Sequence, residues 1–477
     1  MNGTQSCPAP SDLASIVDYA ASLDCIHCGL CLEACPTYTL TGREGSSPRG
    51  RIHAMRAVGE GRLEAGSALK EELSFCLGCR RCESLCPAGA RYGHMLSVAR
   101  DSLAQRFTPW PARLVRFLSL RLVVRSRLLL SGAASTLRLC QRSGLFQALA
   151  RLFPRSARLA ALAALPAVPA RAARRPLPPL TPATAPGPAE TDANDAEVAM
   201  LEGCVMPELL GRVNRATART IAAAGSSCRT APGHVCCGAL NAHNGDLAGA
   251  RALARTTMDA FDALTGAADA PLTVVVNSAG CGAHMKEYVE LFEPGTQDHA
   301  RAQAFASRVR DYAEWLAPRL PALVSPTGIQ APVAYDDPCH LCHGQGIRSE
   351  PRAILDALPG VQRVEMEDSE ACCGSAGTYA LQRPEDAQAV FASRERAFGE
   401  SGAGILVTAN PGCALQWIAG LATSHPQARV LHLAEVVEQA LVEQPDELGA
   451  RWNSPVARQS HRRRGKEGEG ETAEAAL

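Results

Sequence analysis

The apolar positions of this chain follow two different periods. Residues 246–264 (DLAGARALARTTMDAFDAL) repeat apolar side chains every three or four positions, which is typical of an amphipathic helix. Short β-branched runs, TVVV at 273–276 and ILVT at 405–408, are typical of buried strands. Helical and strand-like segments alternate from residue 196 onward, so we predict α/β units in this part of the chain.

This part of the chain also repeats itself. The strings MLEGCVM, HVCCGAL and VVVNSAGCG recur in the same order as VAYDDPCHLC, EACCGSAG and LVTANPGC. The cysteines that correspond are Cys204, Cys236, Cys237 and Cys281 in the first copy, and Cys339, Cys372, Cys373 and Cys413 in the second. Loops beyond the carboxyl ends of parallel strands converge, so each set is expected to gather at one sheet edge. The alternative is that these are small buried residues in tight turns.

Two further cysteine groups lie near the N-terminus. CIHCGLCLEACP and CLGCRRCESLCP both match C-x2-C-x2-C-x3-C-P, the spacing of bacterial 4Fe-4S sites. The fourth cysteine of such a motif ligates the other cluster of the pair. One predicted cluster is therefore held by Cys25, Cys28, Cys31 and Cys86, and the other by Cys76, Cys79, Cys82 and Cys35. The alternatives are a pair of zinc sites or reduced structural thiols, but zinc sites usually combine two Cys-x-x-Cys pairs.

Composition supports metal coordination over disulfides. Most of the twenty cysteines occur at metal-ligand spacings, in a chain of 477 residues with 46% hydrophobic residues, which is ample for buried cores. The N-terminus lacks the features of a secretory signal, and arginine or proline interrupts every long apolar run. We therefore expect a cytoplasmic protein, with a peripheral position on the cytoplasmic face of the inner membrane as an option.

The charge is balanced overall but unevenly distributed. The 48 basic residues equal the 48 acidic ones, yet no acidic residue occurs from Leu103 to Ala189. Within this stretch, WPARLVRFLSLRLVVRSRLLL (110–130) alternates apolar and arginine positions in a helical manner. It could lie on an anionic membrane surface, bridge two domains or contact a partner subunit. Nucleic-acid binding is not expected, because aromatic residues are sparse there. Neighbouring Arg80 and Arg81 are interpreted as ordinary solvated surface charges.

The predicted fold class is α+β and multidomain. A helical two-cluster ferredoxin domain (1–102) precedes a basic helical segment with a Pro/Ala linker (103–190). A duplicated α/β cysteine-rich domain follows (196–320 and 331–447), and a charged, Gly-rich tail (448–477) is expected to be disordered.

The motifs quoted above, together with NSAGCGAHMKEY, ACCGSAGTYALQRPEDA and TANPGCALQW, resemble the glycolate oxidase iron-sulfur subunit over nearly the whole chain. The resemblance implies a subunit that works with flavin-binding subunits to oxidise glycolate to glyoxylate. It also implies that the eight ferredoxin cysteines are the ligands of two 4Fe-4S clusters. More distant relatives serve lactate use, glycerol 3-phosphate oxidation and heterodisulfide reduction, and the last group ends its repeat with Cys-x-x-Cys. This chain departs from that pattern, because the position three residues after Cys281 is His284, and the position three residues after Cys413 is Gln416.

The predicted function is electron transfer from FAD on a partner subunit towards a quinone-type acceptor. No G-x-G-x-x-G follows a strand here, so the substrate chemistry is expected on the partner. The repeat cysteines are candidate ligands of a further cluster or metal, with His284, His340 and His343 as possible extra ligands. Alternative functions are the same role in a lactate or glycerol-3-phosphate dehydrogenase, or a non-catalytic scaffold or redox sensor.

Overall fold

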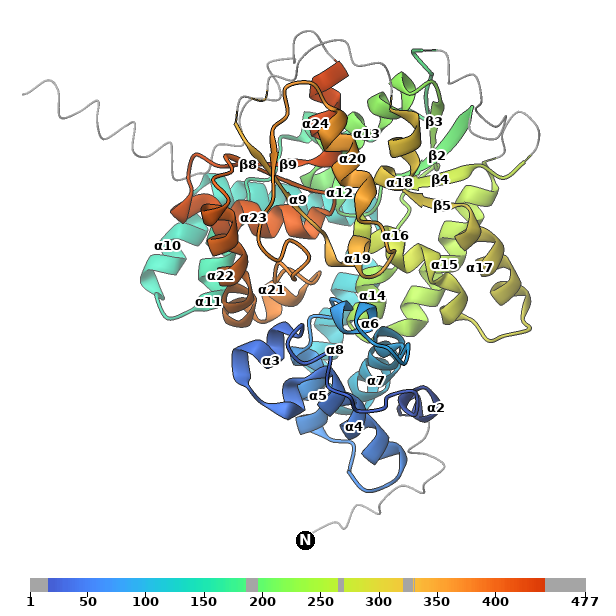
Figure 1. Ribbon diagram of the computed structural model, residues 1–477, viewed down its shortest axis with the longest axis vertical. Helices are drawn as coiled ribbons and strands as arrows, with labels where there is room; N and C mark the ends of the chain where they lie inside the picture. The colour runs from blue at the N-terminus through green and yellow to red at the C-terminus, as the bar shows by residue number, and fades with distance from the viewer. Residues whose placement is uncertain (1–15, 186–195, 265–269, 321–328, 330, 442–477) are drawn as a thin grey trace, which may run out of the picture.

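The computed structural model describes residues 16–185, 196–264, 270–320, 329 and 331–441 (Figure 1). The predicted tail at 448–477 lies outside the described residues, as do the last residues of the predicted linker. Helices surround two separate sheets, and a small helical domain lies at the N-terminal end (Figure 1). The predicted α+β class, with a helical dicluster domain before a duplicated cysteine-rich domain, is confirmed by the family matches given below.

The N-terminal domain is built from short helices around a compact apolar core. Ser47 caps one of them by accepting a hydrogen bond from the Gly50 N–H, and Pro48 occupies the first helical position. Ile52, Met55 and Leu73 are almost fully buried in this core. The elements are α2 (Tyr19–Ser22), α3 (Pro36–Thr41), η1 (Glu44–Ser46), α4 (Pro48–Gly59), α5 (Ser67–Phe75), α6 (Arg81–Ser84) and α7 (Tyr92–Phe107).

The first repeat forms a five-stranded sheet in the order β1-β3-β2-β4-β5. All neighbouring strands are parallel except β1, which pairs with β3 in antiparallel fashion. The strands are β1 (Leu180–Thr181), β2 (Glu197–Leu201), β3 (Ser227–Thr230), β4 (Thr273–Val276) and β5 (Val309–Asp311). The helices are α12 (Met206–Leu209), α13 (Gly211–Ala223), α14 (Ala239–His243), α15 (Leu247–Asp262), α16 (Ala279–Lys286), η5 (Tyr288–Leu291), α17 (Gln297–Ser307), α18 (Tyr312–Leu316) and η6 (Ala317–Arg319).

The second repeat forms an all-parallel sheet in the order β7-β6-β8-β9. This order is equivalent to β3-β2-β4-β5, so the duplication seen in the sequence extends to the strand topology. The strands are β6 (Val333–Asp336), β7 (Arg363–Val364), β8 (Ile405–Thr408) and β9 (Arg429–His432). The helices are α19 (Cys339–Cys342), α20 (Ser349–Ala357), α21 (Tyr379–Gln382), α22 (Pro384–Glu400), α23 (Pro411–Ser424) and α24 (Leu433–Leu441).

The two repeats share one core. Helix α13 of the first repeat packs on α24 of the second, and buried residues of both sheets, such as Met200 and Val407, belong to the same apolar cluster. His432 at the end of β9 donates its Nε2–H to the carbonyl oxygen of Asn277, 3.0 Å away, and its Nδ1 accepts from the Ala434 N–H. The repeats are therefore fixed against each other by both apolar and polar contacts.

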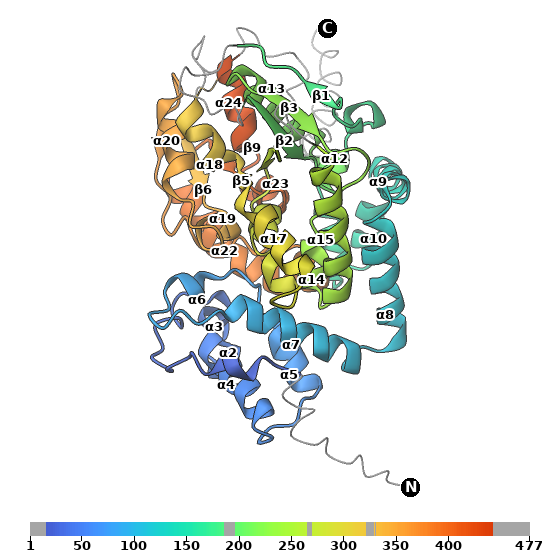
Figure 2. The ribbon, with the colours of Figure 1, turned by 90° about the vertical axis from the view of Figure 1, so that its right-hand side faces the viewer.

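The basic segment forms a series of helices along one side of the molecule (Figure 2). They are α8 (Trp110–Arg116), the π-helix η2 (Phe117–Val123), α9 (Arg127–Arg142), α10 (Leu145–Leu152), α11 (Ala157–Ala164) and the 3-10 helix η3 (Arg171–Arg174). Part of the predicted spacer is not free, since Leu180 and Thr181 pair with Arg229 and Cys228 as strand β1. In the described part of the chain, no helix is both long and apolar enough to cross a membrane.

Candidate iron-sulfur sites

The first ferredoxin motif is an exposed loop before α3. His27 and Gly29 both have left-handed backbone conformations, with φ of 57° and 88°. Cys28 is exposed, and Ile26 and Leu30 beside it are 66% and 61% exposed. Burial raises the pKa of the Cys31 thiol, and nearby Cys25 and Cys35 add to this. Cys25 and buried Cys35 thus lie near Cys31, and the predicted fourth ligand, Cys86, packs against the same N-terminal core as Cys25.

The second motif has the same backbone but is buried. Gly78 and Arg80 take the left-handed conformations here, both with φ of 65°. Cys76 and Cys79 are each only 9% exposed. Burial raises the pKa of Cys82 well above its ordinary value, and nearby Cys79, Cys76 and Cys35 contribute. The structure thus brings together the four cysteines predicted for the second cluster, Cys35, Cys76, Cys79 and Cys82.

Backbone N–H groups and a buried arginine surround these thiols. The Gly78 N–H donates to Cys76 Sγ at 3.3 Å, and the Ala90 N–H donates to Cys86 Sγ at 3.4 Å. Arg51, 1% exposed, would have its pKa lowered by burial, but Tyr92, Cys76 and other nearby groups raise it. Hydrogen-bond donors and positive charges of this kind adjust the reduction potential of an iron-sulfur cluster. The donor set in this domain therefore fits two cubane clusters.

Arg80 and Arg81 join the N-terminal domain to the repeats. Arg80 forms ion pairs with Glu83 and with Glu287 of the first repeat, and its side chain is 19% exposed. Arg81 Nη1 lies 2.8 Å from Asp368 Oδ2 of the second repeat. The interpretation of both residues as solvated surface charges is wrong, because packing between domains covers them.

The repeat cysteines occupy equivalent loops of the two sheets. Cys204 follows β2, Cys236 and Cys237 follow β3, and Cys281 lies in α16 after β4. Hydrogen bonding with neighbouring thiols lowers the pKa of Cys236 and Cys281 and raises that of Cys204 and Cys237. The first set is therefore one contiguous group of thiols.

The second set repeats this arrangement. Cys339 follows β6, Cys372 and Cys373 follow β7, and Cys413 lies in α23 after β8. Neighbouring thiols raise the pKa of Cys372 and Cys413 and lower that of Cys339 and Cys373. The four thiols of this set are also contiguous.

The glycine of each Cys-Cys-Gly string is required by the backbone. Gly238 and Gly374 have φ of 86° and 85°, in the left-handed region that glycine tolerates best. A Cβ at Gly238 would lie 3.2 Å from the Ala250 carbonyl oxygen of α15, and one at Gly374 would clash with the Ala387 carbonyl of α22. The glycines thus let a helix approach each cysteine loop closely.

The second set touches the ferredoxin domain. Hydrogen bonding with the Cys372 thiol lowers the pKa of Cys79, and Cys339 lies close enough to oppose this. Leu77, Cys79, Cys372 and Tyr379 belong to one buried cluster, and Tyr379 Oη donates to the Phe75 carbonyl at 3.1 Å. Cys79, a predicted ligand of the second cluster, therefore contacts Cys372 of the second repeat set directly.

Histidines lie between the two repeat sets. The ring of His243 lies 5.4 Å from that of His340 and 6.5 Å from that of His284, centroid to centroid. Burial lowers the pKa of His284 to about 4, and its Nε2 has no hydrogen-bond partner. His340 Nδ1 lies 3.6 Å from Cys339 Sγ. Of the predicted extra ligands, His284 and His340 thus lie beside the cysteine sets, and His243 joins them although no motif indicates it.

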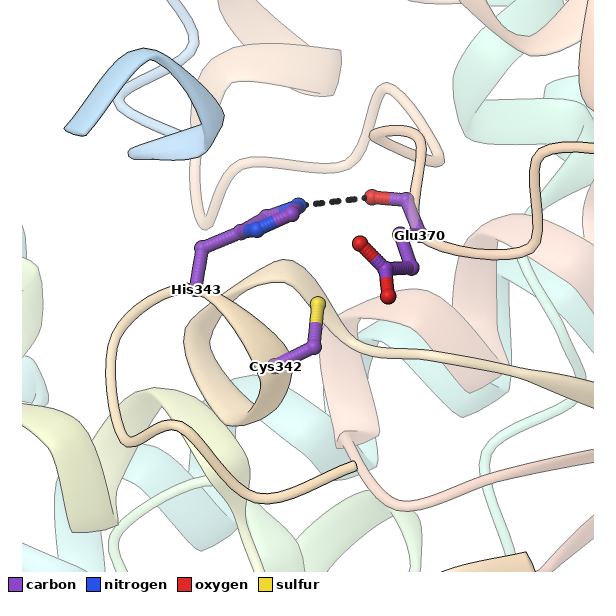
Figure 3. Close-up of side chains that lie close together, drawn as sticks. All are labelled: Cys342, His343 and Glu370. Carbon is purple, nitrogen blue, oxygen red and sulfur yellow. Dashed lines mark hydrogen bonds between the residues drawn. The ribbon is translucent and has the colours of Figure 1, made fainter. Parts of the chain in front are cut away.

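His343, the third predicted extra ligand, belongs to a separate cluster. It lies with Cys342 and Glu370, and the candidate ligand atoms of these three side chains are within 4.8 Å of one another (Figure 3). However, His343 Nε2 donates to the Glu370 carbonyl at 3.0 Å, and Arg348 pairs with the Glu370 carboxylate. The cluster is therefore already satisfied by protein contacts. In the sequence, the C-x2-C spacing of Cys339 and Cys342 could have indicated Cys342 as a candidate ligand, whereas no motif indicates Glu370.

Two four-cysteine motifs in a helical domain, followed by two Cys-Cys-Gly sets on duplicated sheets, define an iron-sulfur electron-transfer protein. Residues 21–90 match the 4Fe-4S dicluster domain family, and residues 198–286 and 333–417 each match the cysteine-rich domain family. All nineteen cysteines in the described residues are free thiols, as metal coordination requires.

Comparison with known proteins gives the particular family. The chain is 34% identical to the probable glycolate oxidase iron-sulfur subunit of Bacillus subtilis, over 89% of this chain and 95% of that protein. It is 33% identical to the glycolate oxidase iron-sulfur subunit of Escherichia coli, over 87% and 93% of the two chains. Lactate utilization protein A of Geobacillus kaustophilus is 24% identical over 50% of this chain and 98% of its own. The chain belongs to the family of glycolate oxidase iron-sulfur subunits.

Proposed function

We propose that this chain carries electrons in a complex that oxidises glycolate to glyoxylate. The supporting observation is the similarity to two glycolate oxidase iron-sulfur subunits along nearly the whole chain. Lactate utilization protein A matches half of the chain at lower identity, which makes lactate the weaker candidate substrate.

The substrate chemistry belongs to a partner. Removal of hydride from a 2-hydroxy acid requires a two-electron cofactor, which iron-sulfur clusters cannot replace. We therefore assign FAD to a flavin-binding partner subunit.

Eight cysteines of the N-terminal domain are proposed to hold two 4Fe-4S clusters. A 4Fe-4S cluster supplies one-electron redox chemistry. The proposed ligands are Cys25, Cys28, Cys31 and Cys86 for one cluster, and Cys76, Cys79, Cys82 and Cys35 for the other.

The exposure of the two motifs supports a direction of electron flow. The exposed motif around Cys28 is accessible to a donor subunit, whereas Cys79 contacts Cys372 of the second repeat. We propose that electrons enter at the first motif and leave through the repeats towards a quinone-type acceptor.

The repeat sets are proposed to hold a further cluster or metal. The ligands would be Cys204, Cys236, Cys237 and Cys281 in the first set, and Cys339, Cys372, Cys373 and Cys413 in the second. The unpartnered Nε2 of His284, three residues after Cys281, supports an additional donor to the first set. We further propose a cytoplasmic location, peripheral to the inner membrane.

The test is anaerobic reduction of the full chain together with its flavin-binding partner subunits. Glycolate is expected to bleach the iron-sulfur absorbance of this chain, and lactate and glycerol 3-phosphate are expected not to. If only lactate or only glycerol 3-phosphate bleached the absorbance, the chain would instead carry electrons in a complex that oxidises that compound. Partner binding without bleaching by any substrate would favour a scaffold or redox sensor.

A further inference from the structure

Residues 106–158, from the end of α7 to the start of α11, form a surface that we call the arginine-leucine belt. The belt covers one side of the molecule and connects the N-terminal domain to the repeats (Figure 2). No acidic residue occurs within it. Ten of its eleven arginines fall into two groups that differ in what they contact.

The first group faces inward. Arg116 Nη1 donates to the Gly245 carbonyl at 3.2 Å, and Arg121 Nε donates to Asp246 Oδ2 at 3.0 Å. Arg138 donates to the Val168 carbonyl. These bonds hold the belt on the first repeat and on its own C-terminal continuation.

The second group faces outward. Seven belt arginines are exposed and form no ion pair with any residue that the structure describes. They are Arg106, Arg113, Arg125, Arg142, Arg151, Arg155 and Arg158. Within the described residues, this positive charge therefore has no acidic partner.

Large apolar side chains are exposed between these arginines. Residues 107–153 contain 13 of the 21 large hydrophobic residues that are exposed in the described chain. Leu128 is 86% exposed, Trp110 is 73% exposed and Leu152 is 70% exposed. On α9, Leu128, Leu139 and Arg142 follow at helical spacing and share the outer face. The outer surface of the belt is thus both apolar and cationic.

We propose that the arginine-leucine belt docks on an anionic lipid surface, with its leucines among the acyl chains and its arginines at the headgroup phosphates. Helices with exposed apolar residues and unpaired basic residues bind membranes in this way. Trp110 and the arginines are of types enriched in protein interfaces, but most of the exposed apolar residues of the belt are leucines, which are under-represented there. A protein partner is therefore the less favoured occupant. The inference rests on the part of the proposed function that places the chain at a membrane.

Docking by the belt would bring one particular cysteine set close to the lipid. Val124 and Leu130 of the belt pack against Cys204 and Cys236 of the first repeat. The His234 Nε2–H also donates to the Val124 carbonyl at 2.7 Å. The first repeat set thus lies directly under the belt, whereas the second set contacts the ferredoxin domain.

The experiment is co-sedimentation of the full chain, purified anaerobically with its iron, with lipid vesicles. The probes are vesicles of equal parts phosphatidylglycerol and phosphatidylcholine, and vesicles of phosphatidylcholine alone. One variant carries Arg113→Gln, Arg125→Gln, Arg142→Gln and Arg151→Gln. A second carries Trp110→Ala, Leu128→Ser, Leu139→Ser and Leu152→Ser. The control carries Arg62→Gln, Arg396→Gln and Arg429→Gln, three exposed arginines outside the belt.

Binding to the anionic vesicles is expected to exceed binding to the neutral ones and to fall as salt rises. Each arginine at an anionic surface contributes about a fivefold gain in affinity, so the four-arginine variant should lose about several hundredfold in affinity. The leucine variant should also lose binding, and the control should retain it.

Absence of vesicle binding, or binding that both belt variants retain, would overturn the proposal. Loss of flavin-subunit binding in the belt variants, with no vesicle binding by the wild type, would identify a protein interface instead. Iron content and reduction by the flavin subunits, measured on the same samples, report on the electron-transfer function separately.

Discussion

The two ferredoxin motifs have the same backbone and opposite surroundings. Their second and fourth loop positions, His27 and Gly29 in one and Gly78 and Arg80 in the other, all have positive φ. Yet Ile26 is 66% exposed, whereas Leu77, at the matching position, is 6% exposed. Cysteine spacing therefore determines the loop, and the side chains between the cysteines determine what the loop contacts.

The difference supports the separate roles that we propose for the two motifs. Ile26 and Leu30 leave the first motif open to a partner chain. Leu77, Arg80 and Arg81 attach the second motif to both repeats. Variants at matched positions of the two motifs test this contrast.

The first test removes the second cysteine of each motif. Cys28→Ala and Cys79→Ala should each lose about four irons per chain. Cys79→Ala should also lower the melting temperature by several degrees, because Cys79 is buried against the second repeat. Iron analysis and calorimetry measure both effects, with Cys140→Ala of α9 as the control. Equal melting temperatures for the two cysteine variants would contradict the contrast.

The second test compares the matched apolar positions. Leu77→Ala should destabilise the protein by about 2–4 kcal/mol, because it leaves a cavity between the domains. Ile26→Ala should change stability by less than about 0.5 kcal/mol, because its side chain is already in water. Urea unfolding followed by circular dichroism measures both. A larger effect at Ile26 would reverse the proposed roles.

The third test removes an ion pair between domains. Arg80→Gln should cost about 2 kcal/mol, because the carboxylates of Glu83 and Glu287 would lose their charged partner. Arg43→Gln is the matched control near the first motif, since Arg43 pairs with Glu72 but is 68% exposed. It should cost less than about 0.5 kcal/mol. Thermal unfolding distinguishes the two, and similar losses would show that Arg80 contributes no more than a surface charge.

The fourth and smallest effect depends on pH. His94 bridges Asp18 of its own domain and Glu290 of the first repeat, with N–O distances of 3.2 Å to each. Hydrogen bonding to Glu290 raises the pKa of His94. Burial opposes ionisation of Glu290, but His94 nevertheless lowers the pKa of that carboxyl.

A histidine whose pKa is higher in the folded protein stabilises the fold fully when the pH is below its pKa in the unfolded chain. This stabilisation is lost as the pH rises through its pKa in the folded protein. Stability from the lowered carboxyl pKa is lost as pH falls. The free energy of unfolding of the wild type should therefore exceed that of His94→Gln by up to about 1 kcal/mol between about pH 5 and 6.5, as measured by urea unfolding. This difference should vanish near pH 8. A difference that grows above pH 7 would exclude the ion pair as its cause.

Local spacing made much of this architecture predictable. The repeated cysteine strings indicated two α/β units, and the family matches and equal strand orders confirm the duplication. The four thiols predicted for each repeat do lie together. They do so because each cysteine follows a parallel strand of the same sheet, and parallel strands end at one edge.

Contacts between distant segments were not predictable. Cys79 and Cys372 are separated by almost three hundred residues, and so are Arg81 and Asp368. His243 has no motif of its own and is placed only by the packing of α14. Because such contacts arise from tertiary packing, one sequence contains no local signal for them.

Low-temperature electron paramagnetic resonance of the anaerobically reduced full chain, with iron analysis of the same sample, tests whether the N-terminal domain holds two 4Fe-4S clusters. We expect at least about eight irons per chain and the signals of two interacting 4Fe-4S clusters. In Cys28→Ala, the signal of one of these two clusters and its interaction with the other should be lost. A colourless protein that contains zinc in place of iron would show that these cysteines do not bind iron-sulfur clusters.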